Sequence, residues 1–133
     1  MNKEIALKWL KQAKHDLELA EKNISIGGYD IAAFLSHQSI EKLLKSIFAL
    51  EGKKIPKIHY IEDLGKGLNL SNQILDRLFD LTGDYTFARY PDVAEQVPYE
   101  IYTEDIAKSK VEKAKYIFAQ LENRYKELLK NEE

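Results

Sequence analysis

Residues 3–52 read KEIALKWLKQAKHDLELAEKNISIGGYDIAAFLSHQSIEKLLKSIFALEG, and the spacing of their apolar residues decides the fold. At about 100° per residue, one side of a helix over residues 3–25 collects a row of apolar side chains, which are Ile5, Trp9, Ala13, Leu17, Ala20 and Ile24. Gly27 and Gly28 can adopt the left-handed backbone that ends such a helix. A second apolar row runs from about residue 29 to about residue 51. The stretch therefore predicts two long amphipathic helices joined by a short turn.

The rest of the chain also follows a helical pattern. The further helices expected are one over residues 59–68, one capped by Ser71, and a last one that follows Thr103 and runs to the C-terminus. Pro91 is expected to end the fourth helix at Tyr90, and residues 97–103 read as a short extended piece. We therefore predict an all-α, up-and-down bundle of four to five helices, with residues 1–133 as a single domain.

Composition excludes several classes of protein. Hydrophobic residues make up 44% of the 133 residues, which is enough for a packed core. The chain has no Cys, so a disulfide scaffold, a thiol nucleophile and a thiolate metal site are excluded. No apolar run approaches the roughly 20 residues that span a bilayer. We expect a cytoplasmic protein that binds neither membrane nor metal and needs no cofactor.

The charges of the chain are nearly balanced. The 20 basic and 22 acidic residues give a net charge of −2, which is no electrostatic footprint for general nucleic-acid binding. DNA is therefore not expected as a partner. Residues 71–102 carry 2 basic and 6 acidic groups, so any anion site in this segment must be local.

Three polar residues fall on apolar helix faces. Asp16 lies in the apolar face of the first helix, where an unpaired carboxylate would be costly, so it needs a partner. Lys110 and Arg124 project from the apolar side of the last helix. They either extend to the edge of that face or meet carboxylates such as Asp16, and the sequence leaves both arrangements open.

A polar ridge lies beside the apolar row of the second helix. His37, Glu41 and Lys45 are spaced four apart and therefore share one helix face. One interpretation is an ordinary intrahelical ion pair between Glu41 and Lys45 beside a partly buried histidine. The other is a polar seam that the helix shares with another chain or a ligand.

Searches for catalytic motifs find none that is complete. The sequence has no glycine-rich phosphate loop, no His-Glu-x-x-His and no Gly-x-Ser-x-Gly. Its three histidines are scattered: His15 is expected on the outer side of the first helix, and His59 at the start of the short helix, next to a basic loop. Large side chains beyond the main apolar rows suggest an exposed patch and hence a dimer; these are Phe34, Phe48, Tyr102 and Tyr116.

The order of these features resembles the HEPN domain, a family named for higher eukaryotes and prokaryotes and for nucleotide binding. The matching residues are Trp9, Ala13, Asp16, Leu17 and Ala20, then Tyr29 and Ala33, then Gln38, Glu41, Lys42 and Lys45, then His59 and Leu64, and finally Arg89-Tyr90-Pro91-Asp92. The resemblance covers nearly the whole chain. It implies a compact helical bundle that usually forms a homodimer.

The resemblance also implies two kinds of function. Small members often act with a minimal nucleotidyltransferase, as a toxin–antitoxin-like or nucleotide-transferring pair. Another branch consists of metal-independent ribonucleases in which an Arg is closely followed by a His. Here the arginines are Arg77, Arg89 and Arg124, and no His follows any of them. The usual general acid or base for 2′-OH attack is therefore absent from that motif.

Two hypotheses follow for the activity. In the first, the chain is a non-catalytic dimeric module that binds a nucleotide or a nucleotidyltransferase partner. Arg89 would then contact a phosphate, and Tyr90 would stack on a base or pack across the interface, with Asp92 in the same corner.

In the second hypothesis, the chain is a divergent ribonuclease toxin that acts on RNA. Its catalytic groups would then converge across a two-fold axis, and the candidates are His37, Glu41, Lys45 and Arg89.

Overall fold

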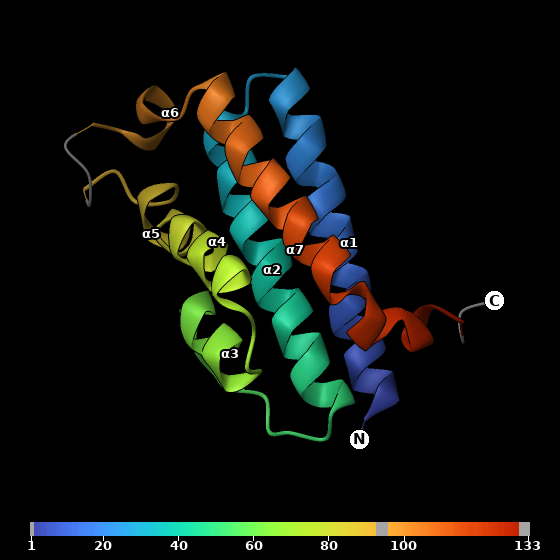
Figure 1. The fold of residues 1–133 in the computed structure, drawn as a ribbon. Coiled ribbons are helices and arrows are strands. Elements are labelled where there is room, and N and C mark those ends of the chain that lie inside the picture. Colours follow the sequence, from blue (N-terminus) through green and yellow to red (C-terminus); the bar gives the residue numbers. More distant parts are fainter. Residues whose placement is uncertain (1, 93–95, 131–133) are drawn as a thin grey trace.

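The structure is a computed structural model, and it describes residues 2–92 and 96–130. Three long helices make up most of it: α1 (Lys3–Ser25), α2 (Tyr29–Leu50) and α7 (Glu104–Lys130). Figure 1 shows the chain rising through α1, descending through α2, rising again through α3, α4 and α5, and descending through α7. The predicted all-α, up-and-down bundle is therefore confirmed, and no strand occurs among the described residues.

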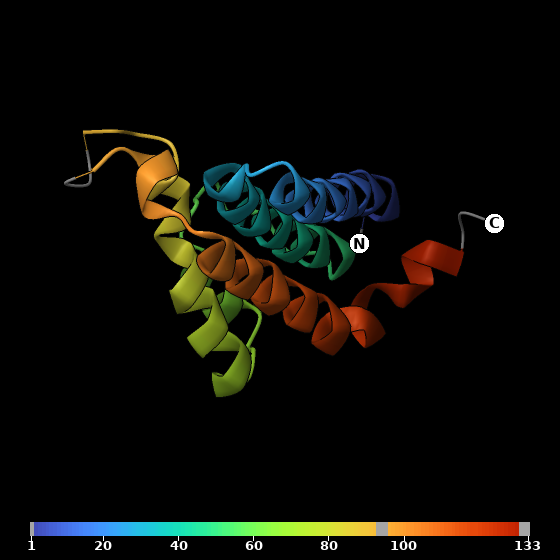
Figure 2. The same ribbon diagram turned by 90° about the horizontal axis from the view of Figure 1, so that it is seen from above.

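Shorter helices cover one side of α2. They are α3 (Ile61–Gly67), α4 (Asn72–Thr82), α5 (Asp84–Phe87) and α6 (Pro98–Ile101). Seen from above, α1 and α2 lie side by side with α7 along them, whereas α4 lies beside the first part of α7 and projects away at an angle (Figure 2). Since α2 packs against α1, α7, α3 and α5, it forms the centre of the bundle.

Two predicted boundaries are wrong. The fourth helix ends at Thr82 and not at Tyr90, because Gly83 follows it and a separate turn, α5, begins at Asp84. Glycine is a poor helix former, about 1 kcal/mol worse than alanine, so a break at this point costs little. Residues 98–101 are helical and only the flanking Val97 and Tyr102 are extended, since Pro98 occupies the first position of α6, where its fixed φ and missing N–H are tolerated.

The predicted helix ends are otherwise close to those observed. Ser71 Oγ accepts a hydrogen bond from the backbone N–H of Ile74 at 3.3 Å, as an N-cap does. Thr103 Oγ1 caps α7 in the same way, from the N–H of Ile106 at 3.2 Å. Of the two glycines in the first turn, Gly27 is left-handed with a φ of 78°, whereas Gly28 has a φ of −83° and starts α2.

The buried face of α1 differs from the predicted one. Its buried residues are Ala6, Leu10, Ala13, Asp16 and Ala20. Ile5 is 41% exposed, and Trp9 and Leu17 are only partly buried. Small side chains face α2 and allow a close approach, at which Ser46 Oγ donates a hydrogen bond to the carbonyl oxygen of Ala6 at 2.9 Å. The larger apolar side chains therefore lie at the edges of the contact.

The three polar residues on apolar faces all have partners, and they do not meet one another. Asp16 forms an ion pair with Lys42 and accepts a hydrogen bond from Gln12 Nε2 at 2.9 Å. Lys110 Nζ lies 3.0 Å from Asp84 Oδ2. Arg124 pairs with Glu51 and also donates to the carbonyl oxygen of Leu68 at 3.0 Å. Lys110 and Arg124 thus attach α7 to the short helices and to the end of α2.

No helix within residues 2–92 and 96–130 combines the length and the apolar character needed to cross a lipid bilayer.

The contact between α3 and α4 leaves no room for a side chain at Gly65. A Cβ atom there would meet Leu75 Cδ2 at 3.0 Å and come closer still to Leu78 Cδ1, and Leu78 is fully buried. Overpacking of about 1–3 kcal/mol should outweigh the roughly 1 kcal/mol that alanine gains in a helix. We expect Gly65→Ala to lower the free energy of unfolding in urea denaturation. Asp63→Ala, at an exposed position of α3, is the control, and a more stable Gly65→Ala protein would contradict this packing.

Candidate functional site

Five residues from α2, the loop before α3 and the segment around α5 form one cluster, which we call the Arg89–His59 site. They are His37, Glu41, His59, Tyr85 and Arg89. The α2 helix brings His37 and Glu41 together because they are one helical turn apart. The loop that follows α2 turns back along it and places His59 beside them, and α5 covers the cluster with Tyr85.

Tyr85 is the centre of the site. The imidazole of His59 stacks on its ring, with centroids 4.4 Å apart and an interplanar angle of 12°. The ring of His37 lies 5.5 Å away at 45°. The guanidinium carbon of Arg89 is 5.0 Å from the centroid of the same ring. One aromatic ring therefore holds a buried histidine, an exposed histidine and an arginine together.

Arg89 is exposed and is held by aromatic rings. Its guanidinium carbon lies 5.3 Å from the Phe34 ring, 5.0 Å from the Tyr85 ring and 5.0 Å from the Tyr90 ring, all within cation–π distance. No carboxylate in the described part of the chain forms an ion pair with this guanidinium. Its N–H groups are therefore oriented by the protein and available to an anion.

Glu41 joins two basic groups inside the site. Its side chain is 6% exposed, and its Oε2 lies 3.1 Å from Lys45 Nζ. His59 Nδ1 lies 3.0 Å from Oε1 and 3.1 Å from Oε2 of the same carboxylate. The ion pair expected within α2 is thus present, but it is buried and is shared with the loop that follows α2. His59, half-exposed at 52%, is the member of this group that reaches solvent.

His37 is fully buried and contacts the backbone of the loop that follows α2. Its Nε2 lies 3.2 Å from the carbonyl oxygen of His59, and its Nδ1 lies 3.2 Å from Gln38 Oε1. Burial lowers the pKa of His37, although Glu41 and the two hydrogen-bond partners oppose this. The imidazole is therefore held in its neutral form, as a structural support for the backbone at His59.

A second polar group anchors α5. Tyr102 Oη donates a hydrogen bond to Asp84 Oδ1 at 2.5 Å, and Lys110 Nζ lies 3.0 Å from Asp84 Oδ2. Burial raises the pKa of Asp84, against the lowering effect of Tyr102 and Lys110. Burial and the neighbouring Asp84 raise the pKa of Tyr102 well above its usual range. This group ties α5, and hence Tyr85, to the start of α7.

A pocket of about 290 Å³ opens beside His59 and Tyr85. The remaining residues of its wall are Lys57, Ile58, Tyr60, Thr82 and Thr86. Thr82 Oγ1 is buried there without a hydrogen-bond partner in the described structure. The volume is at the lower limit of small-molecule pockets, about 300–1,000 Å³. Aromatic walls and a cation suit a ligand of about the size of a nucleobase or nucleoside.

The sequence model of the HEPN domain matches residues 6–124, which include every member of the site. The chain belongs to the HEPN domain family. No match is found in the comparison with curated proteins.

Two solved structures resemble this HEPN chain over nearly its whole length. The crystal structure of TT1696 from Thermus thermophilus has a TM-score of 0.84 and 29% identity, and it covers 93% of this chain and 99% of its own. The crystal structure of ST0689, an archaeal HEPN homologue, has a TM-score of 0.75 and 36% identity, covering 93% of this chain and 98% of its own. These matches support both the family and the fold.

The predicted ligand-binding residues of this HEPN chain other than Arg89 lie either on the surface or in the core. Tyr90 is 41% exposed beside Arg89, and Asp92 is exposed two residues further on. His37, Glu41 and Lys45 are 0%, 4% and 6% exposed, so they offer no surface for direct contact with a second chain. Their predicted convergence with Arg89 across a two-fold axis stays a prediction.

Sequence reasoning missed the two residues that complete the site. Tyr85 had the spacing of a core residue. His59 was expected to open a helix next to a basic loop, whereas Tyr60 is the N-cap of α3. A histidine at the end of a lysine-rich loop was the one signal available. His59 and Arg89 contact the same ring, that of Tyr85, only because α5 packs on α2.

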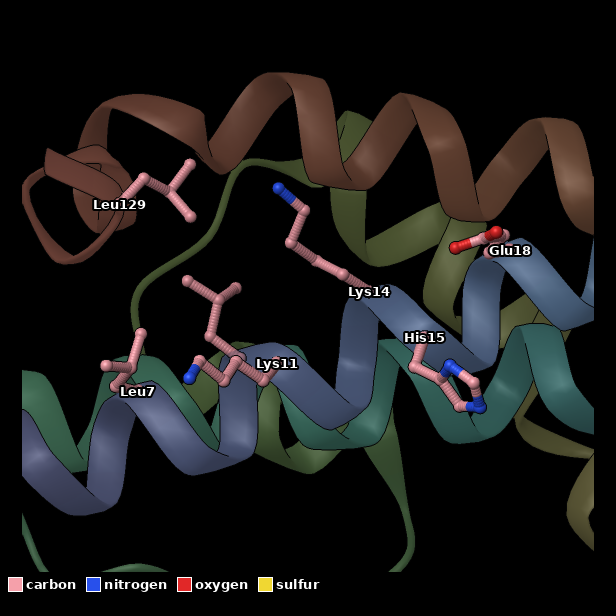
Figure 3. A pocket seen from close by; sticks show the side chains of 7 residues that line it. Leu7, Lys11, Lys14, His15, Glu18 and Leu129 are labelled. Carbon is pink, nitrogen blue, oxygen red and sulfur yellow. The ribbon is translucent and has the colours of Figure 1, made fainter. Parts of the chain in front are cut away.

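Another pocket of this HEPN chain, of about 280 Å³, lies between α1 and the end of α7. Figure 3 shows Leu7 and Leu129 at one end of it, with Lys14, His15 and Glu18 spread along α1. His15 is exposed, as predicted. The charged groups of this pocket do not converge on one point, so we regard the Arg89–His59 site as the candidate.

The stability of this HEPN chain should depend on pH through His37. Its pKa is lowered below 6.5 in the folded state, so below about pH 6.5 the unfolded chain binds the proton more readily and stability falls as pH falls. Asp84, with its pKa raised above 3.8, acts in the opposite direction, because the folded state binds its proton more readily.

We expect His37→Gln to make the fall in Tm between pH 7 and pH 5 shallower, as measured by circular dichroism. His15→Gln, on the surface of α1, is the matched control and should keep the slope of the unchanged protein. An unaltered slope in His37→Gln would contradict the assignment of a neutral, buried imidazole.

Proposed function

We propose that this HEPN chain is a dimeric, non-catalytic module that binds a nucleotide at the Arg89–His59 site and acts with a minimal nucleotidyltransferase. One observation carries the proposal: an exposed guanidinium is held over three aromatic rings, and one of these rings, that of Tyr85, also forms part of the wall of a small pocket. Membership of the HEPN family and the likeness to an archaeal HEPN homologue support it.

The geometry suits a phosphate and a base at the same time. A guanidinium presents a planar fork of donors that matches two phosphate oxygens, and its restraint by rings lowers the entropy lost on binding. Tyr60, in the pocket wall, is 64% exposed, and Tyr90, beside Arg89, is 41% exposed. Either ring offers a free face on which a base can stack, a contact worth about 1–3 kcal/mol.

Two of the four residues expected at a dimer surface are not on the surface. Phe48 and Tyr102 are each only 6% exposed, so they belong to the core and cannot mark an interface. Exposed apolar side chains occur instead on α2, α5 and α6, where Ile31 is 48%, Phe87 45% and Tyr99 72% exposed. Since α5 and α6 both pack on α2, the helices that carry these exposed residues are neighbours.

The test begins with the unaltered protein. Calorimetric titration with adenosine monophosphate should show saturable binding, and sedimentation should show a dimer at micromolar concentration. Purified protein incubated with total RNA should leave the RNA intact. Absence of binding by any of the four common mononucleotides would contradict the nucleotide site, and a monomer would contradict the dimer.

A second candidate function is a metal-independent ribonuclease, and one observation favours it. His59 and Arg89 both contact the Tyr85 ring, so an imidazole stands near the arginine although none follows it in sequence. An imidazole in reach of a 2′-OH could act as its general base. Cleavage of RNA in the presence of a chelator, lost in His59→Gln, would establish this function in place of the first.

A further inference from the structure

Basic residues are concentrated at the end of the bundle where the chain begins. Residues 3–15, in the first half of α1, include four lysines and one glutamate, and residues 51–60, after α2, include three lysines and one glutamate. The two segments together carry a charge of +5 against −2 for the whole chain, which leaves −7 on the other residues. Figure 1 shows the start of α1, the end of α2 and the end of α7 in the same half of the bundle. This end therefore attracts anionic partners.

The pocket of about 280 Å³ between α1 and the end of α7, which we call the α1–α7 pocket, lies at this end. Its apolar wall consists of Leu7, Leu10 and Leu129, of which Leu10 is fully buried and the other two are half-buried. Figure 3 shows Leu129 on α7 opposite Leu7 on α1. The volume is below that of most small-molecule pockets, about 300–1,000 Å³, and it suits an apolar side chain of another protein.

The charged part of the wall is basic. Lys11 and Lys14 both line the pocket, and Figure 3 shows the side chain of Lys14 extending from α1 toward α7. No carboxylate in the described part of the chain forms an ion pair with Lys14. Glu18, the acidic residue of the wall, pairs with Lys22 at 3.0 Å, and the hydrogen bond and charge of Lys22 lower the pKa of Glu18. The charge of Glu18 is therefore already compensated, whereas Lys14 is available to an anion.

We propose that the α1–α7 pocket is the docking site for an acidic segment of a partner protein. An apolar side chain of that segment enters between Leu7, Leu10 and Leu129, and the carboxylates on either side of it pair with Lys14 and with the other basic residues of α1. Apolar burial supplies affinity, and the opposite charges attract and orient the segment. The proposal does not rest on the nucleotide site, because the two pockets share no residue.

Other anionic partners fit this pocket less well. A free phosphate needs cations that meet at one point, but the charged residues of the wall are spread along α1 (Figure 3). An anionic membrane binds helices that bury a face of large apolar side chains in it, whereas here Leu10 is buried and Leu7 and Leu129 are half-buried. A peptide fits both features, since its carboxylates are spaced along its backbone and its apolar side chain can enter the pocket.

Fluorescence anisotropy with a labelled peptide of sequence EEDLLDEE tests the proposal. The matched control peptide is EEDSSDEE, which keeps the charge and lacks the leucines. We expect saturable binding of the leucine peptide, about tenfold tighter than that of the serine peptide because an apolar side chain is buried, and weaker as salt is added. Equal binding of the two peptides, or no saturable binding at millimolar peptide, would overturn the proposal.

Two charge reversals separate the pocket from the overall charge. Lys14→Glu should weaken binding of EEDLLDEE about tenfold or more, because it places a like charge beside the carboxylates. Lys108→Glu makes the same change in net charge on the exposed side of α7, outside the wall of the α1–α7 pocket, and should have little effect. Equal losses in the two variants would overturn the docking site.

A map of amide chemical shifts locates the bound peptide and distinguishes this proposal from the proposed function. With EEDLLDEE we expect the largest shifts at Leu7, Lys14 and Leu129, little change at His59 and Tyr85, and no displacement of the peptide by adenosine monophosphate. Shifts centred on His59 and Tyr85 would overturn the proposal. Binding to phosphatidylserine vesicles that is lost in Lys14→Glu, without binding of the peptide, would assign this face to a membrane and would also overturn it.

Discussion

Arg89→Ala is expected to weaken mononucleotide binding about 10- to 100-fold. Removing the guanidinium removes charge-assisted hydrogen bonds to a phosphate, each worth about 1.5–3 kcal/mol. The aromatic rings that now surround it, those of Phe34, Tyr85 and Tyr90, cannot replace these donors. Calorimetric titration with adenosine monophosphate measures the change, and circular dichroism should show an intact fold because Arg89 is exposed.

The controls separate charge, geometry and position. Arg89→Lys keeps the charge but loses the planar fork, so it should restore only part of the affinity. Arg77→Ala removes another arginine that lies over an aromatic ring, 3.7 Å from the Tyr116 centroid on the α4–α7 face. We expect it to leave binding unchanged. Equal losses in Arg77→Ala and Arg89→Ala would show that binding follows overall charge and not the site.

Lys110→Ala should cause the largest loss of stability among the polar changes, about 3 kcal/mol. Asp84 is 6% exposed in its side chain and would remain buried without its cation, and removal of one partner of a buried pair costs about 3–5 kcal/mol. The Lys110 side chain is 18% exposed, so water can hydrate part of the Asp84 carboxylate after the substitution. We therefore expect a loss at the lower end of that range. Urea denaturation followed by circular dichroism measures the free energy of unfolding.

A double variant tests the cause of that loss. Asp84→Asn combined with Lys110→Met removes both charges and retains an acceptor for Tyr102 Oη, so it should recover most of the stability. Lys108→Ala removes a lysine that pairs with Glu104 on the exposed side of α7 and should leave the unfolding midpoint unchanged. A loss in Lys110→Ala no greater than in Lys108→Ala would contradict a buried ion pair at Asp84.

The fold could be predicted from sequence because helix periodicity and capping are local properties. The apolar row of α2 and the caps at Ser71 and Thr103 depend on residues within one or two helical turns. The buried face of α1 was misjudged because large side chains were given more weight than alanines. Close packing against α2 selects small residues such as Ala6 and Ala13, and that selection depends on the partner helix.

The site could be predicted only where its residues are neighbours in sequence. Glu41 and Lys45 are one turn apart, so their ion pair followed from the spacing. The third partner of that group, His59, lies on a loop whose path no local pattern determines. Tyr85 contacts both His59 and Arg89, and its position depends on α5, which Asp84 fixes against α7. Long-range packing therefore decides which histidine shares an aromatic ring with Arg89.

The most direct test of the central claim, that a nucleotide binds at the Arg89–His59 site, is a map of amide chemical shifts during titration with adenosine monophosphate. We predict saturable shifts that are largest at His59, Tyr85 and Arg89, with little change around His15 and Leu129 at the other pocket. Shifts centred on that other pocket, or no saturable shifts at millimolar ligand, would contradict the claim.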